Sequence, residues 1–326
     1  MRAVVVDRYG PPTHAVVTRR PFPEPRADEI LVRVEAAAVT AGDARLRSGT
    51  FPPGFTVPAR LAMGIRGPRI QVLGNSFAGV VEKTGADVDG FSPGDRVAGM
   101  SGFRMGTHAE HVRVRTKAVA HVPEGVSDVD AAAVLFGGTT ALHFLRDLGQ
   151  VQAGESVLVN GASGAVGTSA VQVARHLGAR VTAVTSAGNA DLVRRLGAAA
   201  VVDYRTTPVT ELTERFDVVL DAVGNLSRSA GRRLLTGDGR LLVVVGSLAA
   251  LLPAKQVHGG TTPENARIVT DTLDLLARGE LDPVVEVMGG LEAVVEAYRR
   301  IDSGHKVGNL VVTPHGPAAT EDGAAS

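Results

Sequence analysis

The sequence predicts an α/β fold in which a doubly wound parallel sheet is joined to a second domain rich in β-strands. The chain has 326 residues, more than one hydrophobic core usually organises, which favours two domains. Its first third contains short apolar runs separated by turn residues. Beyond residue 126, strand-like and helix-like segments alternate, and a glycine-rich loop joins one of these strands to the next helix.

The first segment, residues 1–125, predicts the β-rich domain. Its apolar runs have the length of strands and are bounded by Gly, Pro and Asp. The expected strands cover residues 3–6, 30–39, 78–83, 96–100 and 109–113. Pro52-Pro53-Gly54 and residues 55–68 indicate a long loop, and a loop of that length is a candidate lid over a substrate.

Residues 126–262 predict the doubly wound domain. Two Ala- and Leu-rich helices are expected at 128–135 and 140–148. The strands that follow are expected at residues 156–160, 180–185, 200–203, 218–221 and 240–245, with helices at 166–177 and 190–196.

The last segment, residues 263–326, is expected to return to the first domain. It predicts, in order, helix 263–277, strand 284–287, helix 291–300 and strand 309–313. The two predicted domains are therefore residues 1–125 together with 263–326, and residues 126–262.

The composition excludes several classes of function. The chain contains no cysteine, which excludes disulfides, thiolate nucleophiles, iron–sulfur clusters and cysteine-ligated zinc. Lys plus Arg and Asp plus Glu number 34 each, so we expect no nucleic acid partner. The apolar runs are strand-sized, and the first one reaches Asp7 at once. We therefore expect no membrane segment or signal peptide, and a cytoplasmic protein.

A glycine-rich loop lies between the predicted strand 156–160 and the predicted helix 166–177. In this order, glycines let the backbone approach a pyrophosphate, and the helix N-terminus adds free N–H groups and a positive dipole end. We therefore expect a bound dinucleotide, with a purely structural turn as the alternative. The expected binding residues are Gly161, Ser163, Gly164, Ala165, Val166 and Gly167.

The residues after the second strand of this domain favour NADPH over NADH. An NAD site usually has an acid about 20 residues beyond the glycine loop, where it binds the ribose 2′-hydroxyl. Here strand 180–185 is followed by Ser186-Ala187-Gly188-Asn189, without an acid before Asp191. Ser186 and Asn189 leave space for a 2′-phosphate and offer it hydrogen bonds, although no arginine lies at this turn.

Eight segments in a fixed order carry a resemblance to a known family. They are residues 36–43, 72–74, 78–82, 91–97, 137–141, 159–167, 221–224 and 304–309. Together they resemble the medium-chain dehydrogenase/reductase superfamily, in particular its zinc-free quinone reductase branch, over nearly the whole chain. The resemblance implies a GroES-like β domain built from both ends of the chain, a central Rossmann domain, and an active site in the cleft between them.

The resemblance also implies roles for residues outside the glycine loop. Thr40 and Asp43 match a cleft-facing turn, where Thr40 would donate to the substrate carbonyl or the nicotinamide ribose. Asp43 is equally consistent with a structural acid paired with Arg45 and Arg47. Thr140 matches a nicotinamide-contacting position, with N-capping of a helix as the alternative. The other implied cofactor-binding residues are Tyr204 beside the adenosine 2′-phosphate (alternatively a simple strand-end tyrosine), Val223, Gly246 and Asn309.

Zinc-dependent members of the family place a cysteine where this chain has Thr40, and a histidine in the region that here reads Gly74-Asn75-Ser76-Phe77. Because no three-ligand site can be assembled from these residues, we expect no metal. Without a Lewis acid, alcohol oxidation loses its usual stabilisation of an alkoxide, whereas hydride transfer to an enone or quinone gives a delocalised anion. The sequence therefore predicts NADPH-dependent reduction of a quinone or an α,β-unsaturated carbonyl.

Two alternatives stay open. An enoyl reductase acting on acyl thioesters or on a natural-product intermediate would use the same cleft. A weakly catalytic NADPH-binding sensor or interaction protein would use the same glycine loop. We interpret His108, His111 and His143 as structural rather than as metal ligands or acid–base groups. Because relatives commonly dimerise, the resemblance also implies a homodimer.

Overall fold

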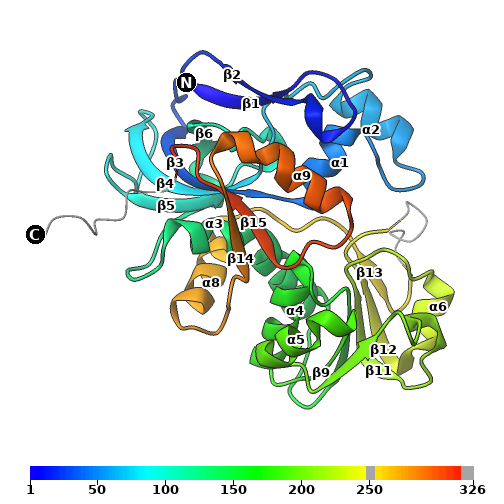
Figure 1. The fold of residues 1–326 in the computed structure, drawn as a ribbon. Coiled ribbons are helices and arrows are strands. Elements are labelled where there is room, and N and C mark those ends of the chain that lie inside the picture. The colour runs from blue at the N-terminus through cyan, green and yellow to red at the C-terminus, as the bar shows by residue number, and fades with distance from the viewer. Residues whose placement is uncertain (247–253, 317–326) are drawn as a thin grey trace, which may run out of the picture.

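The computed structural model describes residues 1–246 and 254–316, and it contains two large β-sheets connected by helices (Figure 1). The N-terminal segment, in blue and cyan, lies beside the C-terminal segment, in orange and red, while the green and yellow central segment forms the other half of the molecule. This arrangement confirms the predicted α/β class. Within the described residues, no helix has the length and apolar composition needed to cross a lipid bilayer.

The central segment forms a six-stranded sheet in the order β10-β9-β8-β11-β12-β13, with every pair parallel. Its inner strands are buried Val- and Leu-rich runs, as a parallel sheet covered by helices requires. Because the chain order reverses between β8 and β11, their carboxyl ends form the crevice where doubly wound sheets bind ligands. The elements are β8 (Ser156–Asn160), α4 (Ala165–His176), β9 (Arg180–Thr185), α5 (Ala190–Leu196), β10 (Ala200–Asp203), β11 (Phe216–Asp221), α6 (Arg228–Arg233), β12 (Leu235–Val243) and β13 (Val257–Gly259).

The two ends of the chain build the second sheet together. Its order is β14-β15-β3-β4-β5-β7, with β6 paired to β3. Leu310 of β15 lies opposite Val39 of β3, so the C-terminal segment returns to the N-terminal sheet, as expected. The strands are β3 (Glu29–Val39), β4 (Ser76–Thr84), β5 (Arg96–Met100), β6 (His111–Arg115), β7 (Val119–His121), β14 (Val285–Gly289) and β15 (Asn309–Val312); β1 (Arg2–Val6) and β2 (Ala15–Arg19) form a separate antiparallel pair.

The domain boundaries at 125/126 and 262/263 stay a prediction. Residues 247–253 and 317–326, which belong to the two predicted domains, lie outside the described residues.

One helix connects the two sheets. α3 (Asp128–Ala141) continues directly into a π-helical stretch, Leu142–Leu148, so the two helices predicted here are one and the prediction of a break between them was wrong. Gly137 and Gly138 interrupt the helical sequence pattern, but in the structure they let α3 pack closely against α4 and α8. A Cβ on Gly137 would lie 2.3 Å from the carbonyl oxygen of Ala165 in α4.

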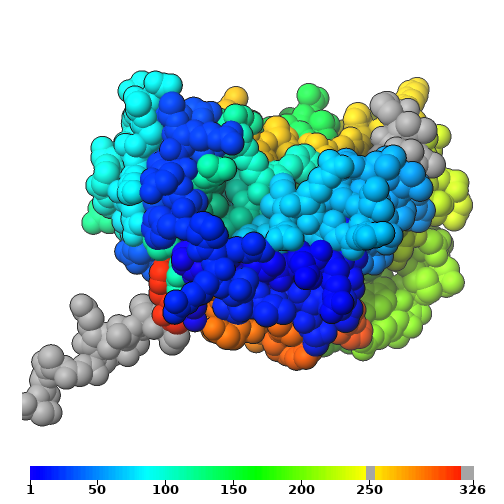
Figure 2. Space-filling view, turned by 90° about the horizontal axis from the view of Figure 1, so that it is seen from above, coloured from blue at the N-terminus to red at the C-terminus, as the bar shows by residue number. Residues whose placement is uncertain are grey.

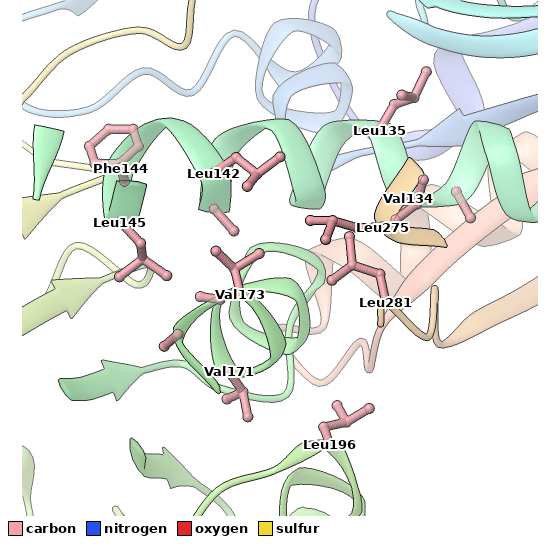
Figure 3. Close-up of a cluster of buried hydrophobic side chains, with 14 of the residues drawn as sticks. Val134, Leu135, Leu142, Phe144, Leu145, Val171, Val173, Leu196, Leu275 and Leu281 are labelled. Carbon is pink, nitrogen blue, oxygen red and sulfur yellow. The ribbon is translucent and has the colours of Figure 1, made fainter. Parts of the chain in front are cut away.

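The helices α3, α4 and α8 (Ala266–Ala277) pack their apolar faces against one another. Figure 3 shows Leu142 of the α3 extension near Val173 of α4, and Val134 of α3 near Leu275 of α8. Burial of each side chain of this size contributes roughly 1.5–3 kcal/mol. This packing connects the two sheets and positions the ligand-binding edge of one beside the other.

Two short helices occupy the region between β3 and β4. α1 (Ala41–Ser48) follows β3 at once, and α2 (Thr56–Met63) lies inside the long loop predicted for residues 55–68, so that prediction was wrong. α2 has no buried residue, and its Val57 and Leu61 are exposed. Its apolar side chains therefore do not form a buried face of the kind that identifies a helix in a sequence. Near the other end of the chain, α9 (Val294–Asp302) packs on α1.

Candidate active site

The glycine-rich loop joins β8 to α4 at the carboxyl edge of the parallel sheet. Two of its glycines are required by the loop itself. Gly161 has a φ of +85°, and a Cβ there would lie 2.6 Å from Val223; a Cβ on Gly167 would lie 2.0 Å from the carbonyl oxygen of Gly161. Gly164 differs, because its φ of −78° suits any residue and a Cβ there would approach only the oxygen of Gly161, at 3.6 Å. The loop is therefore open to a ligand at Gly164.

The first turn of α4 supplies hydrogen-bond donors to this open side. Gly164 has no side chain that could cap the helix, and the first turn contains no acidic residue. The first N–H groups of a helix have no acceptor within the helix, and the positive end of the helix dipole lies there. The N–H groups of Ala165, Val166 and Gly167 thus fit the pyrophosphate of the dinucleotide that the resemblance implies.

A C-terminal segment lies against the same loop. The N–H of Gly308 donates to the carbonyl oxygen of Ser163 at 2.9 Å, which brings the predicted residues Ser163 and Asn309 to one place. The side-chain amide of Asn309 donates to Pro283 O at 2.6 Å. Lys306 donates to the carbonyl oxygen of Gly308, and burial lowers the pKa of Lys306 to about 8.

Two polar side chains at the ends of β8 and β11 hold the next loop against the glycines. Asn160 donates to Asp221 Oδ1 at 2.9 Å, and the same oxygen accepts from the backbone N–H of Val223 at 3.0 Å. Val223 keeps 47% of its surface exposed while it packs against Gly161. This predicted residue therefore presents an apolar surface at the ligand-binding edge. Gly246, also predicted, is buried beyond the end of β12.

The residues predicted to bind the 2′-phosphate lie together at the ends of β9 and β10. Asn189 Nδ2 donates to Ser186 Oγ at 3.2 Å, and the N–H of Tyr204 donates to Thr185 O at 3.2 Å. Tyr204 is 44% exposed, and the guanidinium of Arg205 lies 5.9 Å from the centre of its ring. The turn after β9 contains no arginine, but Arg205, in the turn after β10, lies beside Tyr204. The adjacent pair Tyr204-Arg205 is the sequence feature from which this arginine could have been predicted.

Thr40 and Asp43 form a capping box at the start of α1. The Thr40 hydroxyl and N–H donate to Asp43 Oδ2 at 2.7 and 2.8 Å, and the N–H of Asp43 donates to Thr40 Oγ1 at 3.3 Å. Asp43 is 1% exposed, and its Oδ1 has no partner among the described residues. Arg47 pairs instead with Asp302 at 2.7 Å. Asp43 thus has a structural task, but within the described chain it is not paired with Arg45 or Arg47.

Thr140 lies inside α3 rather than at the start of a helix. α3 begins at Asp128 with Ser127 as its N-cap, so the N-capping alternative for Thr140 is wrong. The Thr140 hydroxyl donates to the carbonyl oxygen of Phe136 at 2.7 Å and accepts from the Thr262 hydroxyl at 3.5 Å. Thr140 therefore lies beside the segment that connects β13 to α8, which contains Thr262.

The structure does not join all the predicted residues into one network. Across the described ranges, no hydrogen bond or ion pair connects Thr40 or Asp43 to the glycine loop. The antiparallel register of β3 and β4 pairs Ala37 with Phe77, so the end of β3, which precedes Thr40, lies near the start of β4.

The histidines have local partners. His108 is fully buried, and its Nε2 lies 3.0 Å from the carbonyl oxygen of Ala38, which can only accept, so Nε2 carries the hydrogen. Its Nδ1 lies 3.5 Å from the hydroxyl of Tyr298, whose pKa burial raises well above the usual value. His111 lies 3.2 Å from Glu82. These contacts agree with a structural interpretation.

Glu264 is a carboxylate that the sequence pattern did not single out. It accepts from Asn75 Nδ2 at 3.2 Å, and a Cβ on Gly102 would lie 2.3 Å from its Oε2. Burial raises the pKa of Glu264, and the Asn75 hydrogen bond and the charge of Lys117 oppose that shift only in part. Glu264 thus keeps a proton to higher pH than an ordinary glutamic acid. No sequence signal was available, since its partner lies 189 residues away.

The positions where zinc-dependent members need ligands do not fit a metal. Thr40 directs its hydroxyl hydrogen to Asp43, and Asn75 is occupied by Glu264 and by the N–H of Gly102 at 3.1 Å. In the part of the chain that the structure describes, no three His, Asp or Glu side chains form a group that could hold a metal ion. A hydroxyl and a carboxamide are poor ligands for Zn²⁺.

Two family models match the chain. One, described as "Alcohol dehydrogenase GroES-like domain", matches residues 26–124, which contain most of the second sheet. The other, described as "Zinc-binding dehydrogenase", matches residues 196–312, which include the second half of the parallel sheet.

Individual relatives cover nearly the whole chain. It is 31% identical over 355 aligned residues to NAD(P)H oxidoreductase RTN4IP1, mitochondrial, of Homo sapiens, covering 96% of this chain and 89% of that protein. It is 28% identical to acryloyl-coenzyme A reductase of Sulfurisphaera tokodaii, covering 96% and 100%. The solved structure of the quinone oxidoreductase from Coxiella burnetii superposes with a TM-score of 0.85 at 27% identity, covering 96% and 99%. Together with the two sheets and the glycine loop, these matches show that the chain belongs to the medium-chain dehydrogenase/reductase superfamily, in its quinone-oxidoreductase-like branch.

Proposed function

We propose that the protein is a zinc-independent, NADPH-dependent oxidoreductase that transfers hydride to a quinone or an α,β-unsaturated carbonyl. The observation that supports this most is the open face of Gly164 at the uncapped N-terminus of α4, which fits a dinucleotide. When bound there, the nicotinamide supplies the hydride. We further propose that the protein acts as a homodimer in the cytoplasm.

The described residues divide the binding of the cofactor among three places. The N–H groups after Gly164 bind the pyrophosphate, and Val223 packs against the cofactor from the neighbouring strand. Tyr204 and Arg205 hold the 2′-phosphate, since a guanidinium next to an exposed ring offers both charge and hydrogen bonds. This last contact is what favours NADPH over NADH.

Thr40 orients the substrate carbonyl. Its hydroxyl hydrogen is donated to Asp43 in the structure, so it must rotate to donate to a substrate. The rotation gives up one hydrogen bond to a carboxylate, about 1.5–3 kcal/mol, which a bond to the developing oxyanion offsets. Asp43 still accepts the hydrogen bond from the N–H of Thr40 during the rotation, and it is therefore a positioning residue.

Glu264 is our candidate for the acid that donates the proton needed to complete the reduction. Its raised pKa, caused by burial, keeps a fraction of the carboxyl protonated at higher pH than usual. Glu264→Gln should lower kcat and flatten the falling alkaline limb of the kcat profile, while NADPH affinity stays unchanged. An unaltered pH profile would remove Glu264 from this role.

A turnover screen tests the proposed function. NADPH oxidation is followed with small quinones, enones and an enoyl thioester, with Gly164→Val as the control for background oxidation. Quinone or enone turnover that the control lacks supports the proposal. Turnover of the thioester alone would favour the second candidate, an enoyl thioester reductase, which the similarity to acryloyl-coenzyme A reductase suggests. NADPH binding without any turnover would favour a sensor.

A further inference from the structure

A cavity of about 550 Å³ lies in the N-terminal half of the molecule, and none of its lining residues comes from the parallel sheet. Its walls come from the end of β2, the segment after α2, the turn after β5, and β6. Figure 2 shows a hollow on the upper face, between the dark-blue N-terminal chain and the light-blue and teal segments that follow it. This volume lies within the range typical of small-molecule sites.

The lining of this cavity is strongly basic. It includes five arginines and no aspartate or glutamate, although the whole chain has a formal net charge of zero. The arginines come from separate segments and meet only in the folded chain: Arg20, Arg26, Arg69, Arg104 and Arg113.

Among the described residues, only two of these arginines have a carboxylate partner. Arg104 and Arg113 share one buried carboxylate, that of Glu29, which bonds Arg104 and lies 3.8 Å from Arg113. Arg20 donates to the side-chain oxygen of Gln71 at 2.5 Å and contacts no carboxylate in the described chain.

Arg26 and Arg69 are exposed, and neither side chain has an ion pair or hydrogen bond among residues 1–246 and 254–316. Together with Arg20, they make three arginines in the cavity lining that have no carboxylate partner in the described chain. Like charges around one cavity repel each other, and an anion bound between them would relieve that repulsion.

The rest of the lining is apolar and includes Ile70, Met105 and Val112. Met105 has a φ of +51°, a strained conformation for a residue with a Cβ, and such strain often marks ligand sites. An apolar wall beside cationic groups suits a ligand that has an organic body as well as a charged group.

We propose that this cavity binds an organic phosphate. The phosphoryl oxygens would lie between Arg20, Arg26 and Arg69, because planar guanidinium groups bind phosphate through paired hydrogen bonds. A phosphate monoester, with nearly two negative charges, matches these three arginines better than a single carboxylate does. The organic part would contact Ile70 and Met105. The argument for phosphate binding at this cavity does not depend on the proposed oxidoreductase function.

The test is calorimetric titration of the full chain with phenyl phosphate, in the presence of saturating NADPH so that the glycine loop is occupied. We expect saturable binding to the unaltered protein. The double variant Arg26→Gln/Arg69→Gln should bind at least about tenfold more weakly, equal to about 1.4 kcal/mol. The matched control is Arg66→Gln, which alters an exposed arginine outside the cavity lining and should change the affinity by less than about twofold.

Each of the following results would overturn the proposal: no saturable binding to the unaltered protein, an equal loss in Arg66→Gln, or full affinity in the double variant. Unchanged NADPH affinity in both variants serves as the check on folding. A second variant, Ile70→Asp, places a carboxylate beside the arginines and should also abolish binding; retained affinity there would equally contradict the proposed site.

The same variants identify the source of the phosphate. If it belongs to a substrate, the double variant should raise the KM for an enoyl-coenzyme A but not for the corresponding pantetheine thioester, which lacks phosphate. If it belongs to a separate molecule, both KM values stay unchanged while phenyl phosphate binding is lost.

Discussion

The variant Gly164→Val tests whether the open side of the glycine loop binds the cofactor, because it leaves the packed side of the loop unchanged. Because Gly164 has a φ of −78° and its Cβ direction is open, the variant should fold with unchanged or slightly higher stability. The valine would instead occupy the space of the pyrophosphate. Losing two hydrogen bonds between backbone N–H groups and a phosphate, each worth roughly 1.5–3 kcal/mol, would weaken NADPH binding by at least about 100-fold.

Gly167→Ala is the contrasting change in the same loop. Its Cβ would lie 2.0 Å from the carbonyl oxygen of Gly161 and 2.7 Å from the Cα of Ala162, both backbone atoms that cannot turn aside. Such overpacking costs about 1–3 kcal/mol or more, so this variant should unfold several degrees lower.

The assay is the same for both variants: thermal unfolding without cofactor, and titration with NADPH. The expected result is a Tm near that of the unaltered protein but lost affinity for Gly164→Val, and a lowered Tm for Gly167→Ala. Undiminished NADPH affinity in Gly164→Val would refute the assignment of this loop face to the pyrophosphate.

Three further outcomes follow from the site. Arg205→Ser should weaken NADPH about tenfold and leave NADH unchanged, since only NADPH carries the 2′-phosphate; titration with both cofactors checks this. Thr40→Ala should lower kcat and cost about 1 kcal/mol of stability through the lost N-cap, and Thr40→Ser should restore both in kinetics and urea unfolding. Burial lowers the pKa of Lys306 from 10.5 to about 8, so its charge opposes folding below pH 8 and the penalty fades as pH rises toward 10.5. Lys306→Met should therefore raise Tm at pH 7 more than at pH 10, and an equal gain at both would count against this account.

The parallel sheet was the most predictable part of the fold. β8, β9 and β10 begin and end at the predicted residues, because each is a short run that contains two valines and is followed by Gly, Ser or Tyr. α1 was missed although Thr40-x-x-Asp43 is a capping signal, since the short segment behind it is polar and lacks a helical apolar face. α3 was divided because Gly137 and Gly138 usually end a helix, whereas here they contact α4 and α8.

The parts of the site that lie within one continuous segment could be predicted from the sequence. The parts that combine residues from several distant segments could not. The glycine loop is continuous in sequence, so its residues could be named in advance. Burial raises the pKa of Glu264, and its neighbours Asn75 and Gly102 are distant from it in sequence. The basic cavity likewise combines segments separated by up to 112 positions, between Met1 and Arg113, and no local pattern indicates that they converge.

The central claim is that a metal-independent site directs hydride from NADPH to an electrophilic carbon, and one comparison tests it most directly. Purified protein treated with a chelator is assayed for NADPH oxidation with a small enone or quinone, and for NADP⁺ reduction with benzyl alcohol. We predict measurable enone or quinone turnover that the chelator does not change, and alcohol oxidation slower by at least about 100-fold, as the loss of roughly 3 kcal/mol of metal stabilisation requires. Faster alcohol oxidation than any enone or quinone reduction, or activity lost with the chelator and restored by Zn²⁺, would contradict the claim.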